Sequence, residues 1–216
     1  MPDTPQLLMF IAAGWLLNLT PGPDVLYIVS NALKSGVRAG IVAALGIVSG
    51  CFVHVFAAAL GVSALLATSA TAFTVLKWIG AAYLVWMGVK LLLAKGGSSV
   101  VPTDVARIKV PANLWRIYRR GFLTNVLNPK VALFFLAFVP QFIAPGAPDK
   151  VTTFLLLGLL FNLNSLPINF GYAWLAGWAA HRVSAVQRTL HWLDRAAGAL
   201  FVGFGLKLAM SDNPNR

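Results

Sequence analysis

Apolar residues fill almost the whole chain, and short polar stretches interrupt them at intervals that suit membrane-spanning helices. Six apolar segments approach the roughly 20 residues that a helix needs to cross a bilayer. They lie at about 6–33, 39–60, 72–94, 121–143, 151–179 and 193–211. The pattern predicts an all-α integral membrane protein with six transmembrane helices, although the Gly-rich last segment leaves a five-span topology open.

The first apolar segment contains a polar stretch that an uninterrupted helix would not carry. Asn18 is followed by Pro21, Gly22 and Pro23, and Asp24 comes next. The prolines lack backbone donors and glycine tolerates most backbone angles, so we expect a broken helix. Irregular backbone inside a membrane has to be buried in protein or line a cavity, and a carboxylate there suggests a transporter site. A simple proline kink, with Asp24 capping the second half-helix, is the alternative.

The fourth apolar segment carries a matching polar stretch, formed by Asn125, Asn128, Pro129 and Lys130. Pro129 frees a backbone carbonyl, the two asparagines offer amide groups, and the ammonium of Lys130 lies near mid-depth, where an isolated charge is unfavourable. Lys130 could pair with Asp24. With a zwitterionic substrate, Asp24 would instead bind the ammonium, and Lys130 or a half-helix N-terminus the carboxylate. Snorkelling of Lys130 is a structural alternative.

The two halves of the chain share a sequence pattern. Residues 81–91 resemble residues 198–208, and a Gly-x-x-x-Asn pair precedes a proline in both the first and the fourth segment. Because each half has three spans, the second half enters the membrane inverted. We therefore expect two inverted three-helix repeats, with Pro-broken helices 1 and 4, unless the similarity arose by chance. The expected boundaries are 1–94, a basic loop at 95–120, the second repeat at 121–211 and a tail at 212–216.

Other polar residues lie within the predicted spans. Asn162 and Asn164 lie in the fifth segment, together with Ser165 and Asn169, and indicate either a hydrated face or hydrogen bonds between helices. His54 in the second segment is a candidate proton relay, with an ordinary hydrogen-bonding role as the alternative.

Small residues also mark the second segment. Gly46 and Gly50 form a small-xxx-small pair that favours close helix packing, although this spacing is frequent in Gly-rich spans.

Composition and charge support a membrane location. The chain of 216 residues is 58% hydrophobic and only 11% charged, and its net charge is +11. The basic residues gather on the first, third and fifth connections, which include Lys34 and Arg38. The positive-inside rule places these connections in the cytoplasm and both termini outside. The charge therefore indicates a lipid bilayer as partner, and not a nucleic acid.

Several chemistries are disfavoured by what the sequence lacks. The chain has one cysteine, Cys51, three histidines and six acidic residues, all of them aspartate. A disulfide-electron carrier needs two membrane cysteines, a metal exporter needs more ligands within its spans, and no nucleotide-binding loop is present. We expect no enzyme activity, no cofactor and no resident metal.

Taken together, three motifs resemble the LysE/RhtB family of bacterial inner-membrane amino-acid exporters, and the similarity runs end to end. The motifs are residues 18–24, 80–90 and 121–130, with Pro140-Gln141-Phe142 as a further match. The resemblance implies six spans, a multi-pass location in the bacterial inner membrane, and export of amino acids or close derivatives. It also implies coupling to the proton motive force.

The function expected from the sequence is therefore a secondary transporter that exports amino acids by proton-coupled antiport. Its partners would be the amino-acid substrate, the proton as coupling ion and the bilayer, while a homo-oligomer remains open. Export of another small solute or a metal cation, or a non-transport role as a membrane assembly subunit, are the alternatives.

Overall fold

The computed structural model describes residues 2–68, 70–93, 113–143 and 149–178, and the short stretches 198–199, 202–203, 205–206 and 209–210. This part of the chain is helical and contains no strand, which confirms the all-α prediction. Most of the basic loop at 95–120, the fifth connection and the tail lie outside the described residues.

The first half of the chain forms four helices: α1 (Thr4–Leu19), α2 (Pro23–Ser35), α3 (Val37–Thr68) and α4 (Ala70–Leu93). The second half begins with α5 (Leu114–Val126) and α6 (Pro129–Leu133). A π-helical turn, η2 (Phe134–Phe138), and a 3₁₀ turn, η3 (Val139–Phe142), follow before the long helix α7 (Lys150–Trp178). Because α5 starts at Leu114, the last residues of the predicted basic loop are helical.

Side-chain caps explain where two of the helices begin. Asp3 and Gln6 form a capping box at the start of α1, in which the Asp3 carboxylate accepts from the Gln6 backbone N–H at 2.8 Å. Asp149 caps α7 and accepts from the side chain and the backbone N–H of Thr152. These hydrogen bonds hold the pKa of the exposed Asp149 carboxyl below its usual range.

Among the described residues, two helical stretches, Val37–Gly61 and Lys150–Trp178, are long and apolar enough to cross a membrane. A third candidate is the pair Leu114–Val126 and Pro129–Phe142, which is bent by 47°. The exterior is suited to a membrane, because large apolar side chains such as Leu60 and Trp178 are more than 60% exposed. Polar side chains are buried inside.

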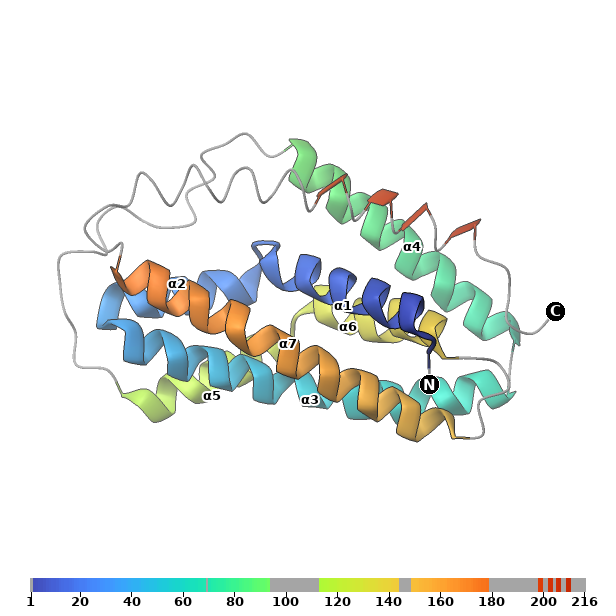
Figure 1. Cartoon of the computed structure of the whole chain (residues 1–216), viewed down its shortest axis with the longest axis horizontal. Coiled ribbons are helices and arrows are strands. Elements are labelled where there is room, and N and C mark those ends of the chain that lie inside the picture. The colour runs from blue at the N-terminus through green and yellow to red at the C-terminus, as the bar shows by residue number, and fades with distance from the viewer. Residues whose placement is uncertain are drawn as a thin grey trace.

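The longest helices pack together through glycine. Figure 1 shows α3 running beside both α5 and α7. A Cβ atom on Gly46 would lie 2.3 Å from the Tyr118 carbonyl oxygen of α5, and one on Gly50 would lie 2.5 Å from the Phe122 carbonyl oxygen. The small-xxx-small pair predicted from the sequence therefore lies at a close backbone contact between α3 and α5.

A cluster of phenylalanines joins α1, the π-helical turn and α7. Phe134 lies 5.0 Å from Phe161 of α7 and 6.2 Å from Phe10 of α1, measured between ring centroids. The change of winding at η2 was not predicted from the sequence. It precedes Pro140, which lacks the N–H that a regular α-helix would need there.

The remaining described helix, α4, lies along one side of the others, and the helical residues between 198 and 210 run beside it (Figure 1). Gly205 permits this contact, because a Cβ atom there would lie 2.6 Å from the Val85 side chain and 2.9 Å from the Ala81 carbonyl oxygen. The two segments that resemble each other in sequence are therefore neighbours in space.

The close contact of Gly46 with the α5 backbone can be tested by measuring protein stability. We expect Gly46→Ala to lower the stability by about 1–3 kcal/mol, because the added methyl group collides with α5 backbone. Gly61→Ala is the matched control, since a Cβ atom there meets nothing within 4 Å. Thermal unfolding of both variants in detergent measures the difference, and equal melting temperatures would contradict the close contact.

Candidate functional site

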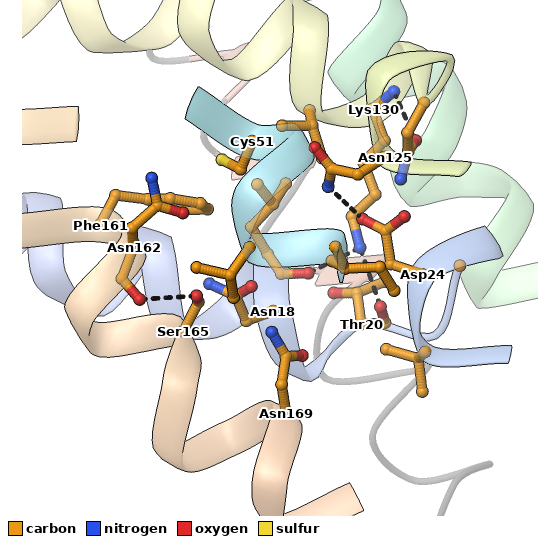
Figure 2. Close-up of a pocket in the computed structure, with 17 residues that line it drawn as sticks. Asn18, Thr20, Asp24, Cys51, Asn125, Lys130, Phe161, Asn162, Ser165 and Asn169 are labelled. Carbon is orange, nitrogen blue, oxygen red and sulfur yellow. Dashed lines mark hydrogen bonds between the residues drawn. The ribbon is translucent and has the colours of Figure 1, made fainter. Parts of the chain in front are cut away.

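A polar cavity lies where the helix ends of the two halves meet (Figure 2). Its walls are the chain between α1 and α2 (residues 20–22, the first turn), the chain between α5 and α6 (residues 127–128, the second turn), and the middles of α3 and α7. Its polar lining residues are Asn18, Thr20, Asp24, Asn125, Asn128, Lys130, Asn162, Ser165 and Asn169. The free volume of the cavity is about 20 Å³, which is room for roughly one water molecule.

Two prolines lie at the first turn, Pro21 within it and Pro23 directly after it, and their missing N–H groups leave two carbonyls without their helical donors. In a continuous α-helix, Pro21 and Pro23 would face the carbonyls of Leu17 and Leu19, four residues earlier. Side chains from the second half of the chain take these places. The Lys130 ammonium donates to the Leu17 carbonyl at 2.6 Å, and the Tyr172 hydroxyl donates to the Leu19 carbonyl at 2.7 Å.

The second turn repeats this arrangement with a partner from the first half. Pro129 would face the carbonyl of Asn125, which instead accepts from the Asn128 backbone N–H and lies 2.8 Å from Nε2 of His54. Because a carbonyl oxygen can only accept, Nε2 of His54 carries a proton. The Asn128 side chain caps α6 by accepting from the Lys130 backbone N–H at 3.1 Å.

Lys130 is buried at the centre of this arrangement and is only 7% exposed. Besides Leu17, its ammonium donates to the Thr20 carbonyl at 2.8 Å, and it acts electrostatically on the Asp24 carboxylate. A lysine in the first turn of a helix opposes the helix dipole, so α6 gains nothing locally from this charge. The position of Lys130 is therefore explained by what its side chain binds across the cavity.

Asp24 lies on the opposite half-helix, as the second residue of α2, where a negative charge suits the helix dipole. Its Oδ2 atom accepts from the Asn125 side-chain amide at 2.8 Å. Its Oδ1 atom is buried without a hydrogen-bond partner, as is Oδ1 of Asn125. Buried polar atoms are rarely left in this way, so the pair of oxygens is open to a hydrogen-bond donor from a ligand.

The α7 wall of the cavity is built by residues at helical spacing. Asn162, Ser165 and Asn169 share one face and are each about 3% exposed or less. The Ser165 hydroxyl donates to the Asn162 carbonyl at 2.7 Å, whereas both side-chain polar atoms of Asn162 are buried without a partner. Asn164 lies on another face, where its side chain donates to Leu160 and accepts from Trp15.

The structure thus brings together most of the residues that the sequence singled out. Those that line the cavity are Asn18, Gly22, Asp24, Asn125, Asn128, Lys130 and Asn162. Pro21 lies in the first turn, and Pro23 and Pro129 directly follow the first and the second turn. His54 reaches the second turn but does not line the cavity, and Asn164 lies away from it.

Sequence reasoning missed Tyr172, and it gave no place at the site to Cys51, which lines the cavity. The spacing of Ser165 and Asn169 from Asn162 was a usable signal, but nothing in the sequence pairs Tyr172 with Leu19. Within the described part of the chain, no group of three or more His, Cys, Asp or Glu side chains could hold a metal ion.

An apolar exterior around a buried polar cavity is the construction of a membrane transport protein. Comparison with known families identifies the family of transport proteins. The family model of LysE type translocators matches residues 15–212, and the chain belongs to this family of membrane translocators.

Similar proteins include two efflux proteins and one without a stated function. The chain is 30% identical over 200 residues to a homoserine/homoserine lactone efflux protein of Salmonella typhimurium, covering 93% of this chain and 94% of that protein. It is 30% identical over 201 residues to a leucine efflux protein of Enterobacter sp., covering 93% of each. It is 35% identical over 195 residues to an uncharacterized membrane protein of Pseudomonas aeruginosa, covering 88% of each. No solved structure matches the chain.

The role of Lys130 in holding the first turn can be measured. We expect Lys130→Met to lower the stability by about 2–5 kcal/mol, since it leaves the carbonyls of Leu17 and Thr20 and the charge of Asp24 without their partner. The exposed Lys34 provides the control, and Lys34→Met should melt within a degree or two of the wild type. Equal losses in the two variants would contradict the bridging role.

Proposed function

We propose that this chain is a secondary transporter that exports amino acids or close derivatives across the bacterial inner membrane by proton-coupled antiport. The observation that carries the proposal is the cavity between the two turns, where a carboxylate with one unpaired oxygen lies near a buried ammonium. A zwitterion needs opposite charges of this kind. The two efflux relatives, named for homoserine and for leucine, support an amino-acid cargo.

The proposed architecture is six spans in two inverted repeats, with helices 1 and 4 broken at their prolines. The two half-helices that follow the turns support it, because each begins with a cap, a proline and a charged residue. In α2 these are Gly22, Pro23 and Asp24, and in α6 they are Asn128, Pro129 and Lys130. Equivalent positions of the two repeats therefore carry opposite charges toward one cavity.

The proposed orientation places the first, third and fifth connections in the cytoplasm and both termini outside. In Figure 1, the junction of α2 and α3, the start of α5 and the end of α7 share one end of the bundle. Lys34 and Arg38 lie at this junction, and α5 presents the exposed Arg116, Arg119 and Arg120. The gathering of basic side chains at one end supports that orientation.

In the proposed cycle, the Asp24 carboxylate binds the ammonium of the substrate in one state and a proton in the other. Lys130 or the N-terminus of a half-helix binds the substrate carboxylate. Each net charge that moves across the membrane contributes about 2.3 kcal/mol per 100 mV. His54 would act as a relay only through Nδ1, because its Nε2 proton is directed at the Asn125 carbonyl.

The small free volume of the cavity supports a contracted, substrate-free state in this cycle. About 20 Å³ admits a water molecule but no amino acid, so binding requires movement of the walls. Alternating access predicts that the cavity opens to one side at a time.

The coupling role of Asp24 is tested by replacing its charge. In proteoliposomes, we expect Asp24→Asn to retain part of the downhill exchange of substrate, because the amide oxygen still accepts a hydrogen bond from the substrate ammonium. Proton-driven uphill export should fall at least about tenfold, because the amide cannot bind and release a proton. Asp149→Asn is the control, since asparagine also caps a helix well. Uphill export by Asp24→Asn at the wild-type rate would show that another group couples transport.

The single cysteine tests alternating access without further engineering. Cys51 lines the cavity and is 3% exposed, so a charged thiol reagent should label it only when the cavity opens toward the side of addition. We expect a saturating amino-acid substrate to slow labelling several-fold, with Cys51→Ala as the unlabelled blank. A labelling rate that is the same from both sides, with and without substrate, would contradict a cargo site at this cavity.

A further inference from the structure

We infer that the α7 wall selects the cargo through the side-chain amide of Asn162, which hydrogen-bonds an uncharged polar group on the side chain of the substrate. The favoured cargo is then an amino acid with a hydroxyl or similar group, in preference to an apolar one of equal size. This inference rests on the proposed export of amino acids and adds the class of cargo.

The first observation is the state of the Asn162 side chain. It is 2% exposed, it lines the cavity, and neither its Nδ2 donor nor its Oδ1 acceptor has a hydrogen-bond partner. The Cys51 thiol lies close enough to interact with this amide, but sulfur is a weak partner. Among the described residues, Asn162 is the only side chain whose donor and acceptor atoms are both buried in this way.

The second observation is that packing does not require the unpaired amide. Asn164, two residues along the same helix, has a partner for both amide atoms: its Nδ2 donates to the Leu160 carbonyl, and its Oδ1 accepts from the indole N–H of Trp15 on α1. An amide that only joined helices would show partners of this kind. Since an unpaired buried amide is unfavourable, the place of Asn162 in the cavity lining indicates a partner that binds there.

The third observation is where Asn162 lies relative to the charges. Figure 2 shows Asn162 and Ser165 on α7, across the cavity from Asp24 and Asn125. In the proposed function, the ammonium and carboxylate groups of the substrate bind on that opposite side. The α7 wall then faces the side chain of the substrate. Phe161, also in the lining, offers apolar surface for the methylene groups of that side chain.

The chemistry of the amide then defines the group that it binds. An amide offers one acceptor and a donor group but no charge, so a hydroxyl, which both donates and accepts, satisfies it best. A site built to bind such a group rejects an analogue that lacks it, because the buried amide is left unpaired. We expect a preference of roughly tenfold or more for the hydroxyl compound.

The first experiment uses the wild-type protein in proteoliposomes and compares transport of homoserine and norvaline, which differ by a hydroxyl in place of a methyl group. The expected ratio of transport efficiencies is about ten or more in favour of homoserine. A ratio near one overturns the inference but leaves amino-acid export intact. Transport of neither compound, nor of leucine, overturns the proposed function and this inference with it.

The second experiment assigns the preference to the residue. Asn162→Leu should bring the ratio close to one, mainly by loss of homoserine transport, whereas Asn162→Ser should keep a preference for homoserine. Asn31→Leu is the matched control, because Asn31 lies on α2 and donates to the Tyr27 carbonyl, and its ratio should equal that of the wild type.

The melting temperatures of the Asn162 variants show whether a change in transport comes from altered substrate selection or from a failure to fold. If Asn162 only held a structural water, both substrates would lose transport equally in Asn162→Leu, and the inference would be wrong. If Asn162→Leu does not fold, Asn162→Ala provides the same comparison with a smaller side chain. A preference for homoserine that persists in Asn162→Ala would overturn the assignment.

Discussion

A proline within a membrane helix leaves one carbonyl without its helical donor, and lipid offers no water to replace it. At the two turns, the structure meets this constraint three times with a side chain from another helix. The donors are Lys130, Tyr172 and His54, and the carbonyls belong to Leu17, Leu19 and Asn125. Two of these donors cross from the second half of the chain to the first, and His54 crosses in the opposite direction. The hydrogen bonds that complete each turn thus bind the halves together.

This exchange of donors explains why the polar residues gather in one place. Once Lys130 reaches into the first turn, Asp24 and Asn125 are brought to the same cavity, and their hydrogen bond links α2 to α5. The groups that maintain the backbone are fully engaged there. The atoms left unpaired belong to Asp24, Asn125 and Asn162, so the atoms that maintain the backbone differ from those to which the proposed function gives a ligand.

The sequence was informative where the chemistry of a residue type alone determines a structural consequence. Apolar length predicted helices, glycine at 46 and 50 predicted a close contact, and Asp24 and Lys130 predicted a polar interior, because an isolated charge is unfavourable there. A proline in the sequence shows that a backbone N–H donor is missing, but it does not indicate which side chain replaces that donor. The partnership of Tyr172 with Leu19 spans 153 residues and depends on how α7 packs, so no local pattern could reveal it. The π-helical turn likewise depends on the phenylalanine packing around Phe134.

The glycine contact between α3 and α5 limits how this molecule can change shape. Gly46, Gly50 and Gly121 bring the two backbones so close that sliding or separation would open a seam without side chains to fill it. The two helices come from opposite halves of the chain, and so rocking of the halves as independent rigid bodies would break this contact. In the proposed cycle, we therefore expect the cavity to open by hinges within each half, with α3 and α5 as the stationary frame.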